Sequence, residues 1–348
     1  MNYLLVAAGL ILLLAGAEFM VRGAVALARR LGVSLMLIGL TIVAYGTTAP
    51  EFVVSLEAAL AGLPGIAFGT VVGTNIANIL LILGTAGLIT PILCRPGALR
   101  RDGAIVVGAS LLFVGFARYG AIAAWQGALM VAILFAVTGI CYWTERREGA
   151  AAAHAREAEE IHRLPRTIEL ILAFLPQTIR LILAFLIGER RPQTIGLTLA
   201  FMIGGLAGVI LGSQLLLEGA VSVARTLGVS EAVIGLTLIA IGTSLPELAT
   251  AVVAAYRRHP ELALGNVLGA NIFNILGVMG TVSLVTRLQV PTKIVDFDLW
   301  VMLGVTMFFV AWMIFTRRLG RPMAVAFLAV YGAYVAVQYL AMPGAAVS

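Results

Sequence analysis

The sequence predicts an all-α polytopic membrane protein with ten transmembrane helices in two inverted five-helix repeats. Three observations support this prediction: the composition, an internal duplication and the distribution of basic residues. Of the 348 residues, 61% are hydrophobic and only 11% are charged, whereas a soluble domain has about 45–50% apolar and roughly 25% charged residues. The apolar segments are continuous along the whole chain, which excludes a soluble enzyme and disfavours a membrane β-barrel with alternating strands.

Hydropathy predicts ten helices near the ~20 apolar residues that span a bilayer. They cover residues 3–28, 34–61, 66–91, 103–117, 120–143, 196–224, 230–256, 262–285, 297–316 and 322–342. A long polar stretch separates the fifth helix from the sixth. We therefore expect a first five-helix repeat over 1–144, a cytoplasmic linker with an apolar in-plane segment over 145–193, and a second, inverted repeat over 194–348.

The internal duplication is the strongest single signal. Residues 16–51 align with residues 212–247 at a constant offset of 196, with 19 identities in 36 positions and no gap. Residues 65–84 align with residues 261–280 at the same offset, with 10 identities in 20 positions. The chain is therefore a duplicated unit of five helices. Because five is odd, the second unit enters the membrane upside down, as in many secondary transporters.

Basic residues agree with this topology, because they concentrate in cytoplasmic loops. With the N-terminus outside, the inner loops carry 19 of the 23 basic residues, and the outer loops carry only Arg118, Arg225, Arg287 and Lys293. We therefore expect a multi-pass protein of the cell membrane with both termini outside and the central loop cytoplasmic. The apolar segment 167–188 would reverse the second half if it crossed, so we expect it to lie on or dip into the inner leaflet.

Two acidic residues, Glu51 and Glu247, lie in the middle of predicted spans at equivalent places in the two repeats. A carboxylate at that depth costs several kcal/mol unless it faces a cavity or a cation. The alternative is a protonated glutamate that hydrogen-bonds a neighbouring helix. Both copies, however, follow a helix breaker directly, because Pro50 and Pro246 lack an N–H group and clash with the preceding turn.

The residues before each proline supply further oxygen atoms. Unwinding of the helix would free backbone carbonyls, and hydroxyl side chains lie in the same turns. Irregular backbone at membrane depth is tolerated only where it lines a cavity or is buried in protein. The candidate oxygens are the carbonyls of Ala44 and Ala240 and the hydroxyls of Thr47, Thr48, Thr243 and Ser244.

A second pair of segments, 69–78 and 265–274, begins with glycines four residues apart. The glycines by themselves indicate close helix packing. The asparagines add chemistry: Asn78 and Asn274 offer amide oxygens, one turn beyond Thr74 and Ala270. The neighbouring asparagines, Asn75 and Asn271, either join these groups or cap and brace the broken backbone, and the pattern does not decide between the two roles.

Together these groups form a site of oxygen ligands without sulfur or imidazole. Such hard ligands suit Ca²⁺, Na⁺ or Mg²⁺ rather than transition metals. Two carboxylates balance the charge of one Ca²⁺, and flexible ligands from four helices can provide the six to eight oxygens that it prefers. Mg²⁺ fits less well, because it demands tight octahedral geometry and gives up its water reluctantly.

These residues resemble those of a known family. The two blocks are similar to the α-repeats of the sodium/calcium exchangers, within the calcium/cation antiporter superfamily, through the paired Gly-Thr-[Ser/Thr]-x-Pro-Glu motifs in both halves. The resemblance implies the ten-helix inverted fold, competition of Na⁺ and Ca²⁺ for shared ligands, and sliding of the first and sixth helices to alternate access. It implies as ligands the side chains of Thr47, Thr48, Glu51, Thr74, Asn78, Thr243, Ser244, Glu247 and Asn274 and the backbone oxygens of Ala44 and Ala240.

Three positions depart from the family pattern. Asn274 stands where many members have aspartate, Ala270 stands where a serine hydroxyl is expected, and Thr70 stands where the second copy keeps Asn266. The first two changes remove a carboxylate and a hydroxyl from one half-site and leave the use and stoichiometry of Na⁺ open. The linker 145–193 is too short for the calcium-sensing domains of animal members, so we expect a prokaryotic type without them.

We therefore expect a secondary active antiporter that exchanges Ca²⁺ for Na⁺ by alternating access at a midplane site. The alternative couples Ca²⁺ or another cation to H⁺, with Glu51 and Glu247 as proton carriers. A cation channel fits less well, because it needs weak sites along a continuous pore. The absence of a Ser–His, Cys–His or metal–histidine constellation argues against an enzyme. The expected partners are Ca²⁺, Na⁺ or H⁺ as counter-ion and the lipid bilayer, with no cofactor, nucleic acid or protein partner.

Overall fold

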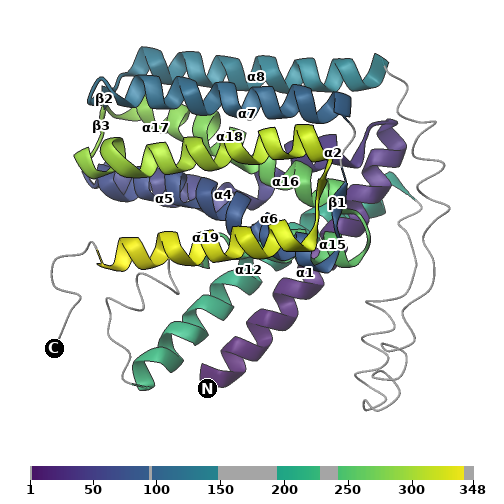
Figure 1. Ribbon diagram of the computed structural model, residues 1–348. Helices are drawn as coiled ribbons and strands as arrows, with labels where there is room; N and C mark the ends of the chain where they lie inside the picture. The colour runs from purple at the N-terminus through teal and green to yellow at the C-terminus, as the bar shows by residue number, and fades with distance from the viewer. Residues whose placement is uncertain (1, 94–95, 148–193, 228–241, 341–348) are drawn as a thin grey trace.

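The computed structural model describes residues 2–93, 96–147, 194–227 and 242–340. This part of the chain is built of helices, several of them with π-helical segments, and of two short two-stranded ribbons. Figure 1 shows most helices side by side in one bundle with α7 and α8 along one edge, while α1 and α12 leave the bundle obliquely as a pair. The prediction of an all-helical membrane protein is confirmed.

The helices follow the predicted spans closely. The first half contains α1 (Asn2–Leu31), α2 (Leu35–Ile38), η1 (Gly39–Val43), α3 (Ala44–Thr47), α4 (Ala49–Leu60), α5 (Pro64–Ala77), η2 (Asn78–Ile82), α6 (Leu83–Ile89), α7 (Pro96–Ala117) and α8 (Ala124–Arg147). The second half contains α12 (Ile195–Thr226), α15 (Leu245–Tyr256), α16 (Pro260–Ile272), η4 (Phe273–Met279), α17 (Gly280–Val285), η5 (Ile294–Asp298), α18 (Leu299–Thr316) and α19 (Arg321–Leu340). In this notation η marks a π-helical segment.

Local sequence signals set several helix ends. Gly32 follows α1 with φ +65°, a left-handed conformation that glycine adopts readily. Ser34 then caps α2, because its hydroxyl accepts a hydrogen bond from the N–H of Leu37 at 3.0 Å. Pro64 and Pro260 begin α5 and α16, where a missing N–H removes no helical hydrogen bond.

The number of spans is only partly visible in the described residues. Seven helices are long and apolar enough to cross a membrane, and the bent pair Leu35–Thr47 and Ala49–Leu60 makes eight. Two helices are not among these eight: α7 has 22 residues but carries three charged residues near its start, and α15 has only 12 residues. The segment before α15, residues 228–241, lies outside the described residues, as does the in-plane segment 167–188. The count of ten therefore stays a prediction.

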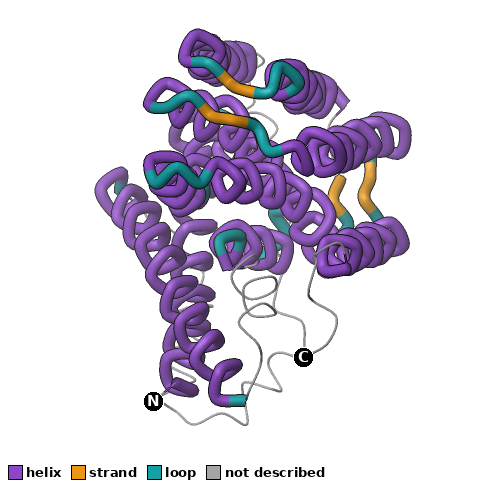
Figure 2. Tube along the Cα trace, turned by 90° about the vertical axis from the view of Figure 1, so that its left-hand side faces the viewer, coloured by secondary structure: helices purple, strands orange, loops and turns teal. Residues whose placement is uncertain are grey.

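Glycines bring α1 and α12 into backbone contact. A Cβ atom at Gly16 would lie 2.5 Å from the backbone N of Val209, and one at Gly212 would lie 2.3 Å from the backbone N of Leu13. These distances leave no room for a side chain, so the helices touch as closely as small residues allow. Figure 2 shows the pair side by side at the N-terminal end of the chain, apart from the other helices.

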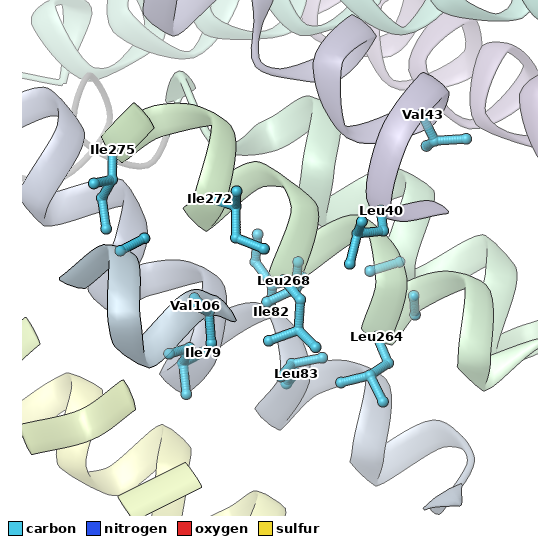
Figure 3. Packing of buried hydrophobic residues seen from close by; sticks show 14 of the residues in the cluster. Leu40, Val43, Ile79, Ile82, Leu83, Val106, Leu264, Leu268, Ile272 and Ile275 are labelled. Atoms are coloured by element: carbon cyan, nitrogen blue, oxygen red, sulfur yellow. The ribbon is translucent and has the colours of Figure 1, made fainter. Parts of the chain in front are cut away.

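The third span of each half lies in the core. In the spanning windows of Pro64–Ile89 and Pro260–Val285, 72% and 83% of the residues are buried, against 11% in Arg321–Gln338. Figure 3 shows Leu268 of α16 against Ile82 of η2 in the apolar core. The two segments with the paired asparagines are thus shielded from lipid.

Two ribbons link the halves. Strand β1 (Ile92–Leu93) pairs antiparallel with β4 (Arg318–Leu319), and β2 (Ala121–Ile122) pairs antiparallel with β3 (Leu288–Gln289). The sequence offset of 196 relates β1 to β3. Figure 1 shows β1 at one end of the bundle and β3 at the other. Equivalent segments at opposite ends are what an inverted repeat would produce.

Candidate functional site

The second span of each half bends in front of a proline. Thr48 has φ −82° and ψ 1° before α4, and its counterpart Ser244 has φ −87° and ψ 3° before α15. The two parts of the first-half span meet at 45°. Equivalent residues therefore adopt the same conformation, and the prolines stand in the first turn of the helices that follow, where a missing N–H is tolerated.

The bend leaves the Ala44 carbonyl less free than the sequence suggests. The N–H of Thr48 still donates to it at 3.0 Å, and the hydroxyls of Thr48 and Thr47 donate to it at 2.7 and 3.3 Å. Threonine hydroxyls commonly turn back to a carbonyl of the preceding turn. Because a carbonyl oxygen has two lone pairs, a cation at Ala44 would have to displace a hydroxyl. Its counterpart Ala240 lies outside the described residues.

Glu51 and Glu247 lie in the first turn of α4 and of α15, where the helix dipole favours negative charge, and both are fully buried. Across the two halves, the Thr48 hydroxyl also lies 3.3 Å from Oε1 of Glu247, so its single hydrogen is shared between this oxygen and the Ala44 carbonyl. The other oxygen of Glu247 and both oxygens of Glu51 have no hydrogen-bond partner among the described residues. Buried oxygens without a donor are unfavourable unless a proton or a cation compensates them.

Four asparagines connect the halves in a nearly two-fold pattern. Asn78 donates from Nδ2 to Oδ1 of Asn271 at 2.9 Å, and Asn274 donates from Nδ2 to Oδ1 of Asn75 at 3.2 Å. Asn271 also donates to the backbone oxygen of Asn75 at 3.1 Å. The amide oxygens of Asn78 and Asn274 accept from no described residue. Asn75 and Asn271 therefore act as braces, which was one of the two roles open from the sequence, and they leave the other two amide oxygens available.

Both pairs of asparagines stand next to a π-helical segment. In the first half η2 begins at Asn78, and in the second half η4 begins at Phe273, one residue before Asn274. A π-helical segment inserts an extra residue into the helix and is frequent at functional sites. In both halves the π-helical segment includes the asparagine whose amide oxygen lacks a partner among the described residues.

The predicted hydroxyl residues divide into partnered and unpartnered groups. Thr47, Thr48, Thr74 and Ser244 are buried, and Thr243 is half-buried. Thr47 and Thr48 form the hydrogen bonds given above, whereas the hydroxyl of Ser244 has no partner among the described residues. Thr47 and Thr48 thus lie at the bend before α4, Ser244 lies at the equivalent bend before α15, and Thr74 lies in the buried helix α5.

Two more residues belong to this region, although the sequence alone did not single them out as ligands. Ser55 lies one turn beyond Glu51 in α4, is fully buried, and its hydroxyl has no partner among the described residues. By contrast, Ser110 and Ser283 bond back to a carbonyl four residues earlier. Asn266 of α16 accepts a hydrogen bond from Thr47 at 3.4 Å, and its Nδ2 has no partner in the described structure. The signal for Ser55 was a polar residue one helical turn from the predicted ligand Glu51, and the signal for Asn266 was a polar residue two turns before the predicted ligand Asn274.

The oxygen atoms of this candidate site are of the kind that hard cations prefer. Its polar atoms are carboxylate, amide, hydroxyl and carbonyl oxygens, and these suit Ca²⁺ and Na⁺. Among the described residues no group of three or more His, Cys, Asp or Glu side chains could hold a metal ion. The described groups therefore offer two buried carboxylates together with neutral oxygens.

Comparison with known proteins places the chain in a family. The profile of the family described as sodium/calcium exchanger protein matches residues 1–143 and 197–340. The chain belongs to the sodium/calcium exchanger family. It is 31% identical over 345 residues to sodium/calcium exchanger MaX1 of Methanosarcina acetivorans, covering 97% of this chain and 98% of that protein. It is 33% identical over 318 residues to the putative antiporter CaxA of Alkalimonas amylolytica, covering 90% and 89%.

A solved structure from the sodium/calcium exchanger family has a similar fold. The sodium-calcium exchanger NCX_Mj, soaked with zero Na⁺ and Ca²⁺, superposes with a TM-score of 0.76 at 26% sequence identity. The alignment covers 97% of this chain and 98% of that one. The resemblance stated from the two sequence motifs is therefore confirmed over almost the whole length, and the family consists of membrane transport proteins rather than enzymes.

Proposed function

We propose that this protein is a secondary active antiporter that exchanges Ca²⁺ for Na⁺ by alternating access at a site near the middle of the membrane. The observation that carries the proposal is a concentration of unpartnered buried oxygens. Among the described residues, ten buried side-chain nitrogen or oxygen atoms lack a hydrogen-bond partner, and six of them are oxygens of predicted ligands. These six belong to Glu51, Asn78, Ser244, Glu247 and Asn274.

A cation explains this pattern better than a purely structural role. A buried polar atom without a partner costs about 1–3 kcal/mol, so six such oxygens in one core would burden folding heavily. A bound cation compensates many of them at once, and two glutamates match the charge of one Ca²⁺. Na⁺ can use the same oxygens, so the two ions would compete rather than bind independently.

The proposed ligands are those implied by the resemblance. Glu51 and Glu247 supply the negative charge, and the other groups complete the coordination as neutral oxygens. The neutral groups are the side chains of Thr47, Thr48, Thr74, Asn78, Thr243, Ser244 and Asn274 and the backbone oxygens of Ala44 and Ala240. Because Asn274 and Ala270 carry neither a carboxylate nor a hydroxyl, we propose that one half-site binds its cation more weakly than the other.

The proposed membrane arrangement follows the charge distribution. The repeats 1–144 and 194–348 span the cell membrane in opposite orientations, with both termini outside and the linker 145–193 in the cytoplasm. The two ribbons at opposite ends of the bundle support this arrangement, as does the positive-inside distribution of arginines. Access would alternate as the first and sixth helices, α1 and α12, move relative to the remaining bundle.

Exchange of Ca²⁺ for H⁺ is the second candidate. Both oxygens of Glu51 lack a donor in the described structure, so a proton could occupy this carboxyl group when no cation is bound. Asn274 supports the same candidate, because it resembles a protonated aspartate in shape and adds no charge for a further Na⁺.

Flux measurements in proteoliposomes test both candidates. The purified protein is reconstituted into vesicles, and a Na⁺ gradient, a pH gradient or no gradient is imposed across the vesicle membrane. Ca²⁺ uptake is then recorded. Uptake driven only by the Na⁺ gradient supports Ca²⁺/Na⁺ exchange, whereas uptake driven only by the pH gradient replaces it with Ca²⁺/H⁺ exchange. Equal uptake without either gradient would instead identify a channel, and no uptake in any condition would contradict all three.

A further inference from the structure

Asn266 is a buried amide whose hydrogen bonds are incomplete. It is fully buried in α16 and faces Thr47 of the other half, whose Oγ1 lies 3.4 Å from Asn266 Oδ1. Its Nδ2 atom has no partner among the described residues. The counterpart of Asn266 in the first half is Thr70, a half-buried hydroxyl residue. The amide is therefore a feature of the second half alone.

Close helix packing holds Asn266 at this place. A Cβ atom at Gly265 would lie 2.2 Å from the Met36 carbonyl oxygen, and one at Gly39 would lie 2.9 Å from the backbone N of Asn266. The backbone of α16 thus rests directly on α2 and η1, two turns before the bend that contains Thr47. A side chain anchored in this way has little freedom to turn toward other partners.

The hydrogens at Thr47 favour one orientation of the amide. The Thr47 hydroxyl has one hydrogen, yet two acceptors lie within reach: Ala44 O at 3.3 Å and Asn266 Oδ1 at 3.4 Å. An asparagine amide turned over about its last bond keeps nearly the same shape. The amide nitrogen then donates to Thr47 Oγ1, and the single Thr47 hydrogen goes to Ala44. In this orientation the unpartnered atom of Asn266 is an oxygen.

The surroundings of that oxygen point to a cation. The unpartnered buried atoms of the described residues include the oxygens of Glu51, Glu247, Asn78 and Asn274, and Asn266 contacts the bend that carries Glu51 through Thr47, four residues before that glutamate. On α16, Ala270 lies one turn after Asn266 and on the same face, because residues four apart are neighbours on a helix. Ala270 presents a methyl group where Thr74 presents a hydroxyl in the first half. The second half therefore lacks a hydroxyl oxygen at Ala270, and Asn266 offers an amide oxygen from the preceding turn.

We propose that Asn266 is a further ligand of the transported Ca²⁺, whose amide oxygen replaces the hydroxyl that Ala270 lacks. The inference rests on the proposed cation transport and extends it by one residue. It also explains how a member without the expected hydroxyl keeps a complete set of oxygens. Thr47 holds the amide nitrogen, so the same contact fixes the direction of the ligand.

Calorimetric titration of the detergent-solubilised full chain with Ca²⁺ alone tests the ligand assignment. We expect Asn266→Ala to raise the Ca²⁺ Kd about tenfold. Adding Ala270→Ser to the same chain should restore the Kd to within about threefold of wild type, because the serine hydroxyl would return the missing oxygen. Asn266→Ser is a milder change, and its Ca²⁺ Kd should lie between those of Asn266→Ala and the double variant. It keeps the test valid if Asn266→Ala misfolds. Thr70→Ala, the equivalent position of the first half, serves as the matched control and should bind Ca²⁺ like wild type.

The outcomes separate this inference from the proposed function. Absence of Ca²⁺ binding to the wild-type chain would contradict the proposed function itself. Wild-type binding that Asn266→Ala leaves unchanged would refute the ligand role and leave the function standing. Weaker binding in Asn266→Ala without any recovery from Ala270→Ser would show that Asn266 only positions Thr47, which also overturns the assignment.

Discussion

Asn78 donates a hydrogen bond of 2.9 Å to Asn271, a residue 193 positions further along the chain. The contact joins the two halves in the core, and Asn274 makes the equivalent contact to Asn75 at 3.2 Å. Each half therefore orients an amide oxygen of the other half. This exchange ties the geometry of the proposed cation site to the packing of the repeats, because each half orients an amide of the other.

The cross-brace can be tested without changing any proposed ligand. Asn271→Ala removes the acceptor of Asn78 and leaves a buried Nδ2 unpaired, which costs about 1–3 kcal/mol of stability. We expect a lower melting temperature and a Ca²⁺ Kd raised about tenfold, because the Asn78 amide loses its fixed direction. Asn75→Ala should act similarly through Asn274. Wild-type Ca²⁺ affinity in both variants would show that the asparagines contribute packing alone.

The two glutamates are predicted to be indispensable. Glu51→Gln and Glu247→Gln keep the shape of the side chain but remove one of the two charges that balance Ca²⁺. Loss of one charge-assisted ligand costs about 1.5–3 kcal/mol, so each variant should lose Ca²⁺ exchange in proteoliposomes. Size-exclusion profiles should match wild type, because a neutral amide is easier to bury than a carboxylate. Wild-type exchange rates in either variant would contradict the site assignment.

The proposed weaker half-site offers a test of ion coupling. Asn274 donates Nδ2 to Asn75 Oδ1, so an aspartate there would face an oxygen unless it is protonated or Asn75 turns over. Ala270→Ser with Asn274→Asp should therefore change the Na⁺ and pH dependence of Ca²⁺ flux more than Ca²⁺ binding itself. We would record flux against Na⁺ concentration at two pH values. Curves that overlay those of wild type would mean that the two departures are silent.

An ion pair anchors α1 to the end of α15. The Glu18 carboxylate accepts from Arg22 at 2.6 Å and from Nε of Arg257 at 2.9 Å, with a second contact to the same guanidinium, and only 10% of its side chain is exposed. We expect Glu18→Gln to lower the free energy of unfolding by about 1.5–3 kcal/mol. Glu57→Gln, at an exposed position of α4, is the control and should stay within about 0.5 kcal/mol of wild type. Equal stability of both variants would show that the pair contributes nothing.

The membrane topology can be tested with two cysteines. In a chain without Cys94 and Cys141, Tyr256→Cys next to Arg257 should react only with reagent from the cytoplasm, and Lys293→Cys only with reagent from outside. Both positions are exposed in the structure. The pair also tests the segment 167–188, because a second half flipped by that segment would exchange the two labelling patterns.

Much of the fold was predictable because its signals are local. The apolar runs of about 20 residues identify helices, and the prolines at positions 50 and 246 mark the bends that the structure places at Thr48 and Ser244. The bend angle and the hydrogen bonds around each proline were less predictable. The helix is bent by 45° and its hydroxyls return to the Ala44 carbonyl, because local hydrogen bonding competes with the unwinding that proline favours.

By itself the sequence determined the membrane-helical class, the duplication and the choice of oxygen-rich residues for the proposed site, since each follows from composition, spacing or the offset of 196. Only the tertiary structure decided which asparagines brace and which keep a free oxygen, and that Asn266 faces Thr47. The physical reason is distance along the chain: these contacts join residues about 190 to 220 positions apart. They depend on how the glycine-lined helices of the two halves approach each other, which side-chain spacing within one helix does not encode.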